Sequence, residues 1–121
     1  MSESPDTIYM IDEIELRPGR LEPFLEAFRA RYLPIAEQRG MSLLHTWITP
    51  PEGPPDLGET VLLVWGLAGI PGFWRMRSQT GTPGIAEWWR ECETFSVRRT
   101  RRFAVAPEAR EGYLAAGRVH A

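Results

Sequence analysis

The sequence predicts an α+β protein with a ferredoxin-like βαββαβ fold, in which helices cover one face of a four-stranded antiparallel sheet. Strand-like and helical stretches follow one another in the order strand, helix, strand, strand, helix, strand. The chain has 121 residues, 43% hydrophobic and 25% charged, which suits one globular domain. This order is the split βαβ unit, in which the last strand lies antiparallel beside the first.

The first strand and helix are expected within residues 7–40. Residues 7–16 alternate with period two, so that Asp12 shares one face with apolar residues while Glu13 and Glu15 share the other. After the turn sequence RPGR, apolar residues recur at helical spacing up to Gly40, which should end the helix. We expect Pro34 to kink this helix because proline lacks a backbone N–H.

Residues 41–49 predict a second strand in which Leu43, His45 and Trp47 alternate on the same face as Met41. A proline-rich loop at residues 50–59 ends it. The continuous apolar run TVLLVWGL at residues 60–67 then predicts a central strand that is buried on both faces.

A broken helical region at residues 70–95 leads to the last strand, residues 96–105. The break is TGTPG, and we expect Thr82 to cap the second helical piece, with Pro83 at its first position. Residues 1–107 are thus predicted to form the ferredoxin-like domain. Residues 108–121 form a polar C-terminal tail, for which we expect a short helix that packs on a partner subunit.

Composition argues against several classes of protein. The 14 basic residues are all arginine, but the net charge is −2, so a nucleic-acid partner is not expected. No stretch approaches the roughly 20 apolar residues of a spanning helix, and the N-terminus lacks a signal-like pattern, so we expect a cytoplasmic protein with no membrane partner. The single cysteine, Cys92, rules out an internal disulfide and a cysteine-cluster metal site.

Four arginines lie in the last strand, which the predicted topology places beside the acidic first strand. Opposite charges on neighbouring antiparallel strands stabilise the pairing by about 0.2 to 1 kcal/mol per pair. We therefore interpret the arginines as half of an ion-pair ladder, in preference to a nucleic-acid patch. Arg98 and Arg102, accompanied by Ser96, should face the same way as Glu13 and Glu15.

The other two arginines, Arg99 and Arg101, are expected to share the helix-facing side with Val97 and Asp12. Charges beneath a helix layer are costly unless they are paired or lie beside a hydrated cavity. A polar spot within an apolar layer is also how small-molecule pockets are built. The sequence therefore predicts a pocket at this position.

Two segments, IYMIDEIELRPGRLEPFLEAF and RYLPIAEQRGMSLLHTW, resemble the NIPSNAP-like branch of the dimeric α+β barrel superfamily. The resemblance implies a homodimer in which the uncovered sheet faces of two subunits pack together. The superfamily includes cofactor-free monooxygenases, polyketide cyclases, lactone isomerases, haem enzymes and members without known activity, so it implies the fold more firmly than the reaction. The matching residues are Pro18, Gly19, Leu21, Phe24, Tyr32, Leu33, Pro34, Gly40 and Trp47.

Asp12 and His45 are the candidate catalytic residues, as an acid/base pair across the predicted pocket. Arg99 or Arg101 would hold a carboxylate or oxyanion. The remaining candidates are aromatic side chains that would line the pocket: Tyr32, Trp47, Trp74 and Trp89. The structural alternatives are a histidine that only packs, a structural ion pair at Asp12, and tryptophans that belong to the core or a dimer interface.

These residues predict a small dimeric enzyme that performs cofactor-free proton transfer, of the isomerase, cyclase or monooxygenase type, on an apolar aromatic or polycyclic oxygen-bearing molecule. The alternative is a non-catalytic small-molecule-binding or assembly module of the NIPSNAP-like type. We expect no cofactor and no metal, because His45 and Asp12 supply only two possible ligands and zinc sites need three or four. Haem with His45 as axial ligand is the remaining cofactor hypothesis.

Overall fold

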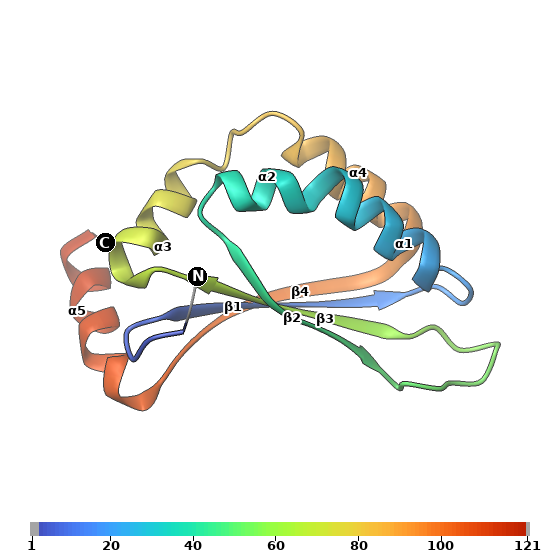
Figure 1. Ribbon diagram of the computed structural model, residues 1–121, viewed down its shortest axis with the longest axis horizontal. Coiled ribbons are helices and arrows are strands. Elements are labelled where there is room, and N and C mark those ends of the chain that lie inside the picture. Colours follow the sequence, from blue (N-terminus) through green and yellow to red (C-terminus); the bar gives the residue numbers. More distant parts are fainter. Residues whose placement is uncertain (1–2, 121) are drawn as a thin grey trace.

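The computed structural model describes residues 3–120, with side chains as far as residue 116, and contains a four-stranded antiparallel sheet with helices on one face (Figure 1). Residues 1, 2 and 121 of the predicted domain and tail lie outside the described residues. The predicted ferredoxin-like α+β fold is confirmed, with the sheet order β2-β3-β1-β4. The strands are β1 (Ile8–Leu16), β2 (Ser42–Thr49), β3 (Thr60–Leu67) and β4 (Ser96–Val105).

The first helical segment runs through Pro34 by widening its turn. It consists of α1 (Leu21–Ala27), a π-helical turn η1 (Phe28–Tyr32) and α2 (Leu33–Gln38). The Leu33 N–H donates to the carbonyl of Phe28, five residues earlier. Because Pro34 has no N–H to donate, a regular α-helical bond is missing here, and the wider turn accommodates the gap. The disturbance of the helix that we expected at Pro34 therefore takes the form of a π-turn before it.

The second helical region is broken as expected, but its cap is not the predicted one. It consists of α3 (Gly69–Ser78) and α4 (Ile85–Phe95). The prediction that Thr82 caps α4 is wrong, because the Thr82 hydroxyl donates to the Gln79 carbonyl at 2.7 Å. Gly84 precedes α4 with φ of 96°, a left-handed conformation that interrupts the helix path before Ile85.

In the tail, a short 3₁₀ turn η2 (Pro107–Ala109) leads into α5 (Arg110–His120). This helix packs against α3 of the same chain, where the rings of Tyr113 and Phe73 lie 5.8 Å apart between centroids. Figure 1 shows α5 next to α3 at one end of the sheet.

The core lies between the sheet and the helices. Alternate residues of β1 are buried on this side, whereas the residues between them are only partly covered. Trp65 on β3 is fully buried, and its ring centroid lies 5.9 Å from that of Phe28 and 6.0 Å from that of Tyr32. β3 is a central strand, as its apolar run predicted, and it lies between β1 and β2.

A bulge in β2 reverses the predicted faces of two side chains. Leu43 pairs with Trp65, His45 pairs with the adjacent Val64, and Leu44 is left between them as an extra residue. Since side chains alternate with period two, one extra residue transfers everything after it to the opposite face. His45 and Trp47 therefore lie on the uncovered face of the sheet, and the prediction that they share the face of Leu43 is wrong.

A second bulge, at Val97 in β4, has the same effect on two smaller side chains. Glu15 pairs with Arg98 and Leu16 pairs with Ser96, so Val97 has no partner in β1. Val97 is 60% exposed and Ser96 is buried, which is the reverse of the prediction. The four arginines come after the bulge and keep their predicted faces.

Gly58 lies so close to β1 that we expect any side chain there to destabilise the protein. A Cβ atom at Gly58 would lie 1.7 Å from the carbonyl oxygen of Leu16. Gly58→Ala should lower the free energy of unfolding by about 2 kcal/mol, as overpacking typically does. Urea denaturation measures this, with Gly81→Ala as the control because a Cβ there would meet nothing within 4 Å. Equal effects of the two substitutions would contradict the prediction.

Candidate functional site

Asp12 lies beneath the helix layer and is held by two neighbouring strands. Its side chain is 4% exposed. Arg101 on β4 donates from Nε to Oδ1 at 2.6 Å and from Nη2 to Oδ2 at 3.0 Å. The indole Nε1 of Trp65 on β3 donates to Oδ2 at 3.0 Å. The expected placement of Asp12 and Arg101 on the helix-facing side is confirmed.

The predicted ion-pair ladder is also confirmed on the uncovered face of the sheet. Arg102 lies 3.0 Å from Glu13, and Arg98 lies 3.7 Å from Glu15. The side chains of these two pairs are between 37% and 71% exposed, so each pair contributes little to stability. The buried pair of Asp12 and Arg101 is therefore the ion pair that we expect to matter most for stability.

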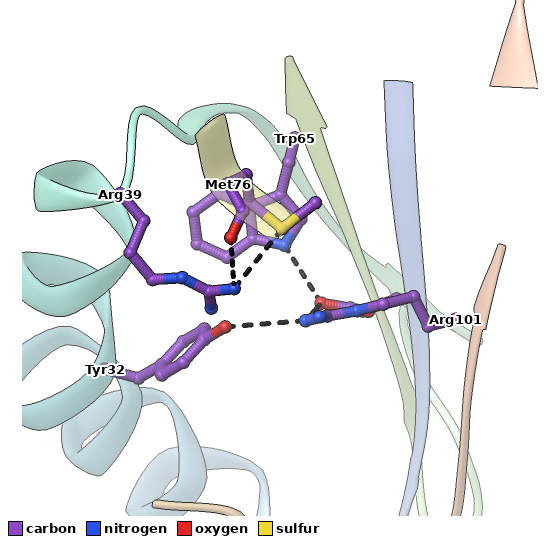
Figure 2. A network of polar contacts seen from close by, with 6 residues as sticks. Tyr32, Arg39, Trp65, Met76 and Arg101 are labelled. Atoms are coloured by element: carbon purple, nitrogen blue, oxygen red, sulfur yellow. Dashed lines mark hydrogen bonds and ion pairs between the residues drawn. The ribbon is translucent and has the colours of Figure 1, made fainter. Parts of the chain in front are cut away.

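A second arginine, Arg39, enters the same buried region from the C-terminal end of α2. Figure 2 shows Arg39 and Arg101 directed toward each other on either side of the Tyr32 hydroxyl. Arg101 Nη2 donates to Tyr32 Oη at 3.4 Å. Arg39 Nη2 donates to the Met76 carbonyl at 3.1 Å and to the Met76 sulfur at 3.3 Å. Arg39 is 3% exposed, and its buried Nε has no partner among the described residues.

The two guanidinium groups have opposite electrostatic surroundings. Burial disfavours the charge of Arg101, but the hydrogen bonds and negative charge of Asp12 outweigh burial and raise the pKa of Arg101. Burial lowers the pKa of Arg39; Arg101 adds to this effect and Tyr32 opposes it. With both arginines charged and one carboxylate, the cluster carries one uncompensated positive charge.

A small cleft of about 50 Å³ opens beside Asp12, between β4 and α4. The Trp89 ring forms its wall, with the Arg99 and Arg101 guanidinium carbons 4.2 and 5.2 Å from the ring centroid. The volume suits a few waters or a small functional group. The lining residues are Asp12, Ile14, Trp89, Arg99, Thr100 and Arg101.

The structure brings some of the predicted site residues together and separates others. Asp12, Arg101 and Tyr32 form one network, and Arg99 and Trp89 line the adjoining cleft. The other three candidates, His45, Trp47 and Trp74, lie elsewhere.

His45 and Trp47 stack on the uncovered sheet face, with ring centroids 4.7 Å apart. The prediction of an Asp12 and His45 pair across one pocket is therefore wrong, because the sheet separates them. Trp74, on α3, packs against Phe73.

Arg39 is the residue that the sequence reasoning missed. It follows Tyr32 by seven positions and Ala36 by three, and all three are buried on one side of the helical segment. That spacing was the available signal. Arg39 was missed because it immediately precedes Gly40 at the end of the predicted helix, where arginines are usually solvated.

Comparison with solved structures identifies the fold. An uncharacterized NIPSNAP-like domain protein from Burkholderia xenovorans matches with a TM-score of 0.66 and 20% identity, over 85% of this chain and 87% of its own. A NIPSNAP family protein from Agrobacterium tumefaciens matches with a TM-score of 0.65 and 17% identity, over 88% and 90%. The chain has a NIPSNAP-like fold. The resemblance inferred from the first half of the sequence is confirmed at this level.

A further structural neighbour has a named activity. A putative antibiotic biosynthesis monooxygenase from Nitrosomonas europaea matches with a TM-score of 0.57 and 12% identity, over 88% of this chain and 96% of its own. No family model and no curated protein matches the chain. At such identities the likeness establishes the NIPSNAP-like fold, and function has to be argued from the site.

Between residues 3 and 120, no helix combines the length and apolar character needed to cross a membrane. Over the same part of the chain, no three histidine, cysteine or acidic side chains gather where they could hold a metal ion.

Proposed function

We propose that the protein is a homodimeric enzyme that transfers protons on a small oxygen-bearing aromatic molecule without a dissociable cofactor. The observation that carries the proposal is the buried Asp12, Arg101 and Tyr32 network beside the cleft at Trp89. Buried ionisable groups next to a cleft are more frequent at functional sites than elsewhere. The size of the cleft favours the polar end of a molecule over a buried polycycle.

The network provides the groups that enolisation of a carbonyl compound needs. Asp12 accepts a proton from the carbon next to the carbonyl, and the Tyr32 hydroxyl gives its proton to the carbonyl oxygen. Arg101, fixed in orientation by Asp12, stabilises the negative charge that develops on that oxygen. Asp12 then gives its proton to a different carbon and the enol oxygen returns its proton to Tyr32, which completes an isomerisation and restores both side chains.

The test is exchange of carbon-bound hydrogen in deuterated water. Nuclear magnetic resonance would follow loss of the proton next to the carbonyl in a panel of monocyclic aromatic ketones. The protein should accelerate exchange, and Tyr32→Phe should reduce the acceleration by about 10²- to 10⁴-fold. Tyr113→Phe, which removes a hydroxyl from α5, is the control and should retain the rate. An unchanged rate in Tyr32→Phe would refute the proposal.

The second candidate is a non-catalytic small-molecule-binding module. One observation favours it: three hydrogen bonds already engage the two oxygens of Asp12, which leaves little capacity for proton transfer. In that case ligands would bind beside Trp89, and none of the panel would exchange its proton faster than in buffer.

A second copy of the chain is the proposed partner of the uncovered sheet face. This face carries the stacked His45 and Trp47, and Trp47 is 52% exposed. The Glu13 and Glu15 carboxylates lie on it beside Arg98 and Arg102. A surface with both signs of charge and an exposed aromatic group is suited to pair with itself about a two-fold axis.

A further inference from the structure

Arg39 is a buried cation that the fold itself does not neutralise. It is 3% exposed, and none of the described carboxylates forms an ion pair with it. The one buried carboxylate nearby, Asp12, is bound in fork geometry to Arg101. Burying a guanidinium without a counter-charge costs free energy, so we ask which interaction of Arg39 offsets this cost.

The contacts of Arg39 with α3 do not offset this cost. The main contact of Arg39 is with the Met76 carbonyl, but the backbone N–H of Gln79 already donates to that carbonyl at 3.1 Å. Loss of Arg39 would therefore leave the end of α3 satisfied. The buried Nε of Arg39 remains a donor without an acceptor among the described residues.

The polar side chains of this region lie close together. In Figure 2 the guanidinium of Arg39 and the hydroxyl of Tyr32 face the space that Arg101 enters from β4. The cluster carries one net positive charge, and the cleft of about 50 Å³ beside Trp89 reaches this cluster at Asp12 and Arg101. A carboxylate is planar, carries one negative charge and matches the fork geometry of a guanidinium.

We propose that Arg39 recognises the carboxylate of a small aromatic acid, which binds between Arg39 and the Tyr32 hydroxyl and neutralises the buried cluster. This inference rests on the proposed function for the place of the site and names its ligand class. It requires only binding, so it does not depend on proton transfer.

The first test is the stability of the ligand-free protein. Arg39→Met replaces the side chain with an apolar one of similar length, and such replacements of buried charges are often neutral or stabilising. The melting temperature of Arg39→Met should equal or exceed that of the wild type. A clear fall in melting temperature would show that Arg39 serves the fold, and would overturn the inference.

The second test is binding of benzoate, measured by calorimetry at constant ionic strength, with neutral benzamide for comparison. Benzoate should bind the wild type more tightly than benzamide does. Arg39→Met should lower the affinity for benzoate by about tenfold to a hundredfold. Arg31→Met is the matched control, because Arg31 lies on η1 and its exposed side chain pairs with Glu91 at the surface. Benzoate that binds Arg39→Met as tightly as the wild type, or does not bind the wild type, would overturn the inference.

The outcomes also separate this inference from the proposed function. Binding of benzoate through Arg39, with no proton exchange in any ketone, would refute the proposed proton-transfer activity and support the anion site. Proton exchange that depends on Tyr32, with benzoate binding unaffected by Arg39→Met, would support the enzyme and refute the anion site.

Discussion

Asp12→Asn is expected to lower the free energy of unfolding by about 3 kcal/mol, because it leaves the Arg101 guanidinium without its counter-charge. The Asp12 side chain is 4% exposed and that of Arg101 is 29% exposed, so water can only partly replace the carboxylate. Asparagine keeps one acceptor oxygen but turns an NH₂ group toward a hydrogen-bond donor. Urea denaturation followed by tryptophan fluorescence measures the loss.

Glu91→Gln provides a matched control for this substitution. Glu91 also receives two hydrogen bonds from one arginine, Arg31, but at the surface of the helix layer. The side chains of this pair are 55% and 30% exposed, so its loss should change stability by about 0.5 kcal/mol or less. Similar losses in Asp12→Asn and Glu91→Gln would show that burial does not strengthen the Asp12 pair.

Trp47→Glu is expected to convert the proposed homodimer into a folded monomer. A two-fold interface through the uncovered sheet face would contain the substituted residue twice, and each new carboxylate would lose its water without a partner to replace it. Loss of a central tryptophan costs about 2 to 4 kcal/mol in many interfaces, so dimer affinity should fall by about a thousandfold. Size-exclusion chromatography with light scattering gives the mass, and circular dichroism checks the fold.

Leu57→Glu is the control for the dimer prediction. Leu57 is another exposed apolar residue, at 61%, but it lies in the loop between β2 and β3 and not on the sheet. This variant should retain the mass of the wild type. A monomeric wild-type protein, or a Trp47→Glu variant that remains dimeric, would contradict the proposed interface.

The pairing of Asp12 with Arg101 was predictable because it depends on two simple regularities. The order of elements placed the first and last strands side by side, and period-two alternation placed both residues on one face. Neither regularity requires knowledge of packing. The ladder on the opposite face followed from the same two rules.

The error at His45 has the same origin, because alternation fails wherever an extra residue enters a strand. Nothing around Leu44 marks it as the bulge, since the preceding residue, Leu43, is also a leucine. One residue was enough to move His45 from the expected pocket to the opposite side of the sheet.

Arg39 could not be assigned for a different reason. Its burial depends on where α3 lies, and Met76 on that helix accepts its hydrogen bonds. A contact between residues 37 positions apart leaves no pattern in a single sequence. The π-turn before Pro34 adds a further shift to the helix face on which Tyr32 and Arg39 lie.

The proposed role of the buried cluster at Asp12, Arg101, Tyr32 and Arg39 is to bind a small anion. A crystal structure of the protein with benzoate tests it most directly. The carboxylate should lie within hydrogen-bond distance of Arg39 Nε and Tyr32 Oη, with the Asp12 and Arg101 pair intact. Benzoate bound only elsewhere, with Arg39 Nε hydrogen-bonded to a protein group in its place, would contradict it.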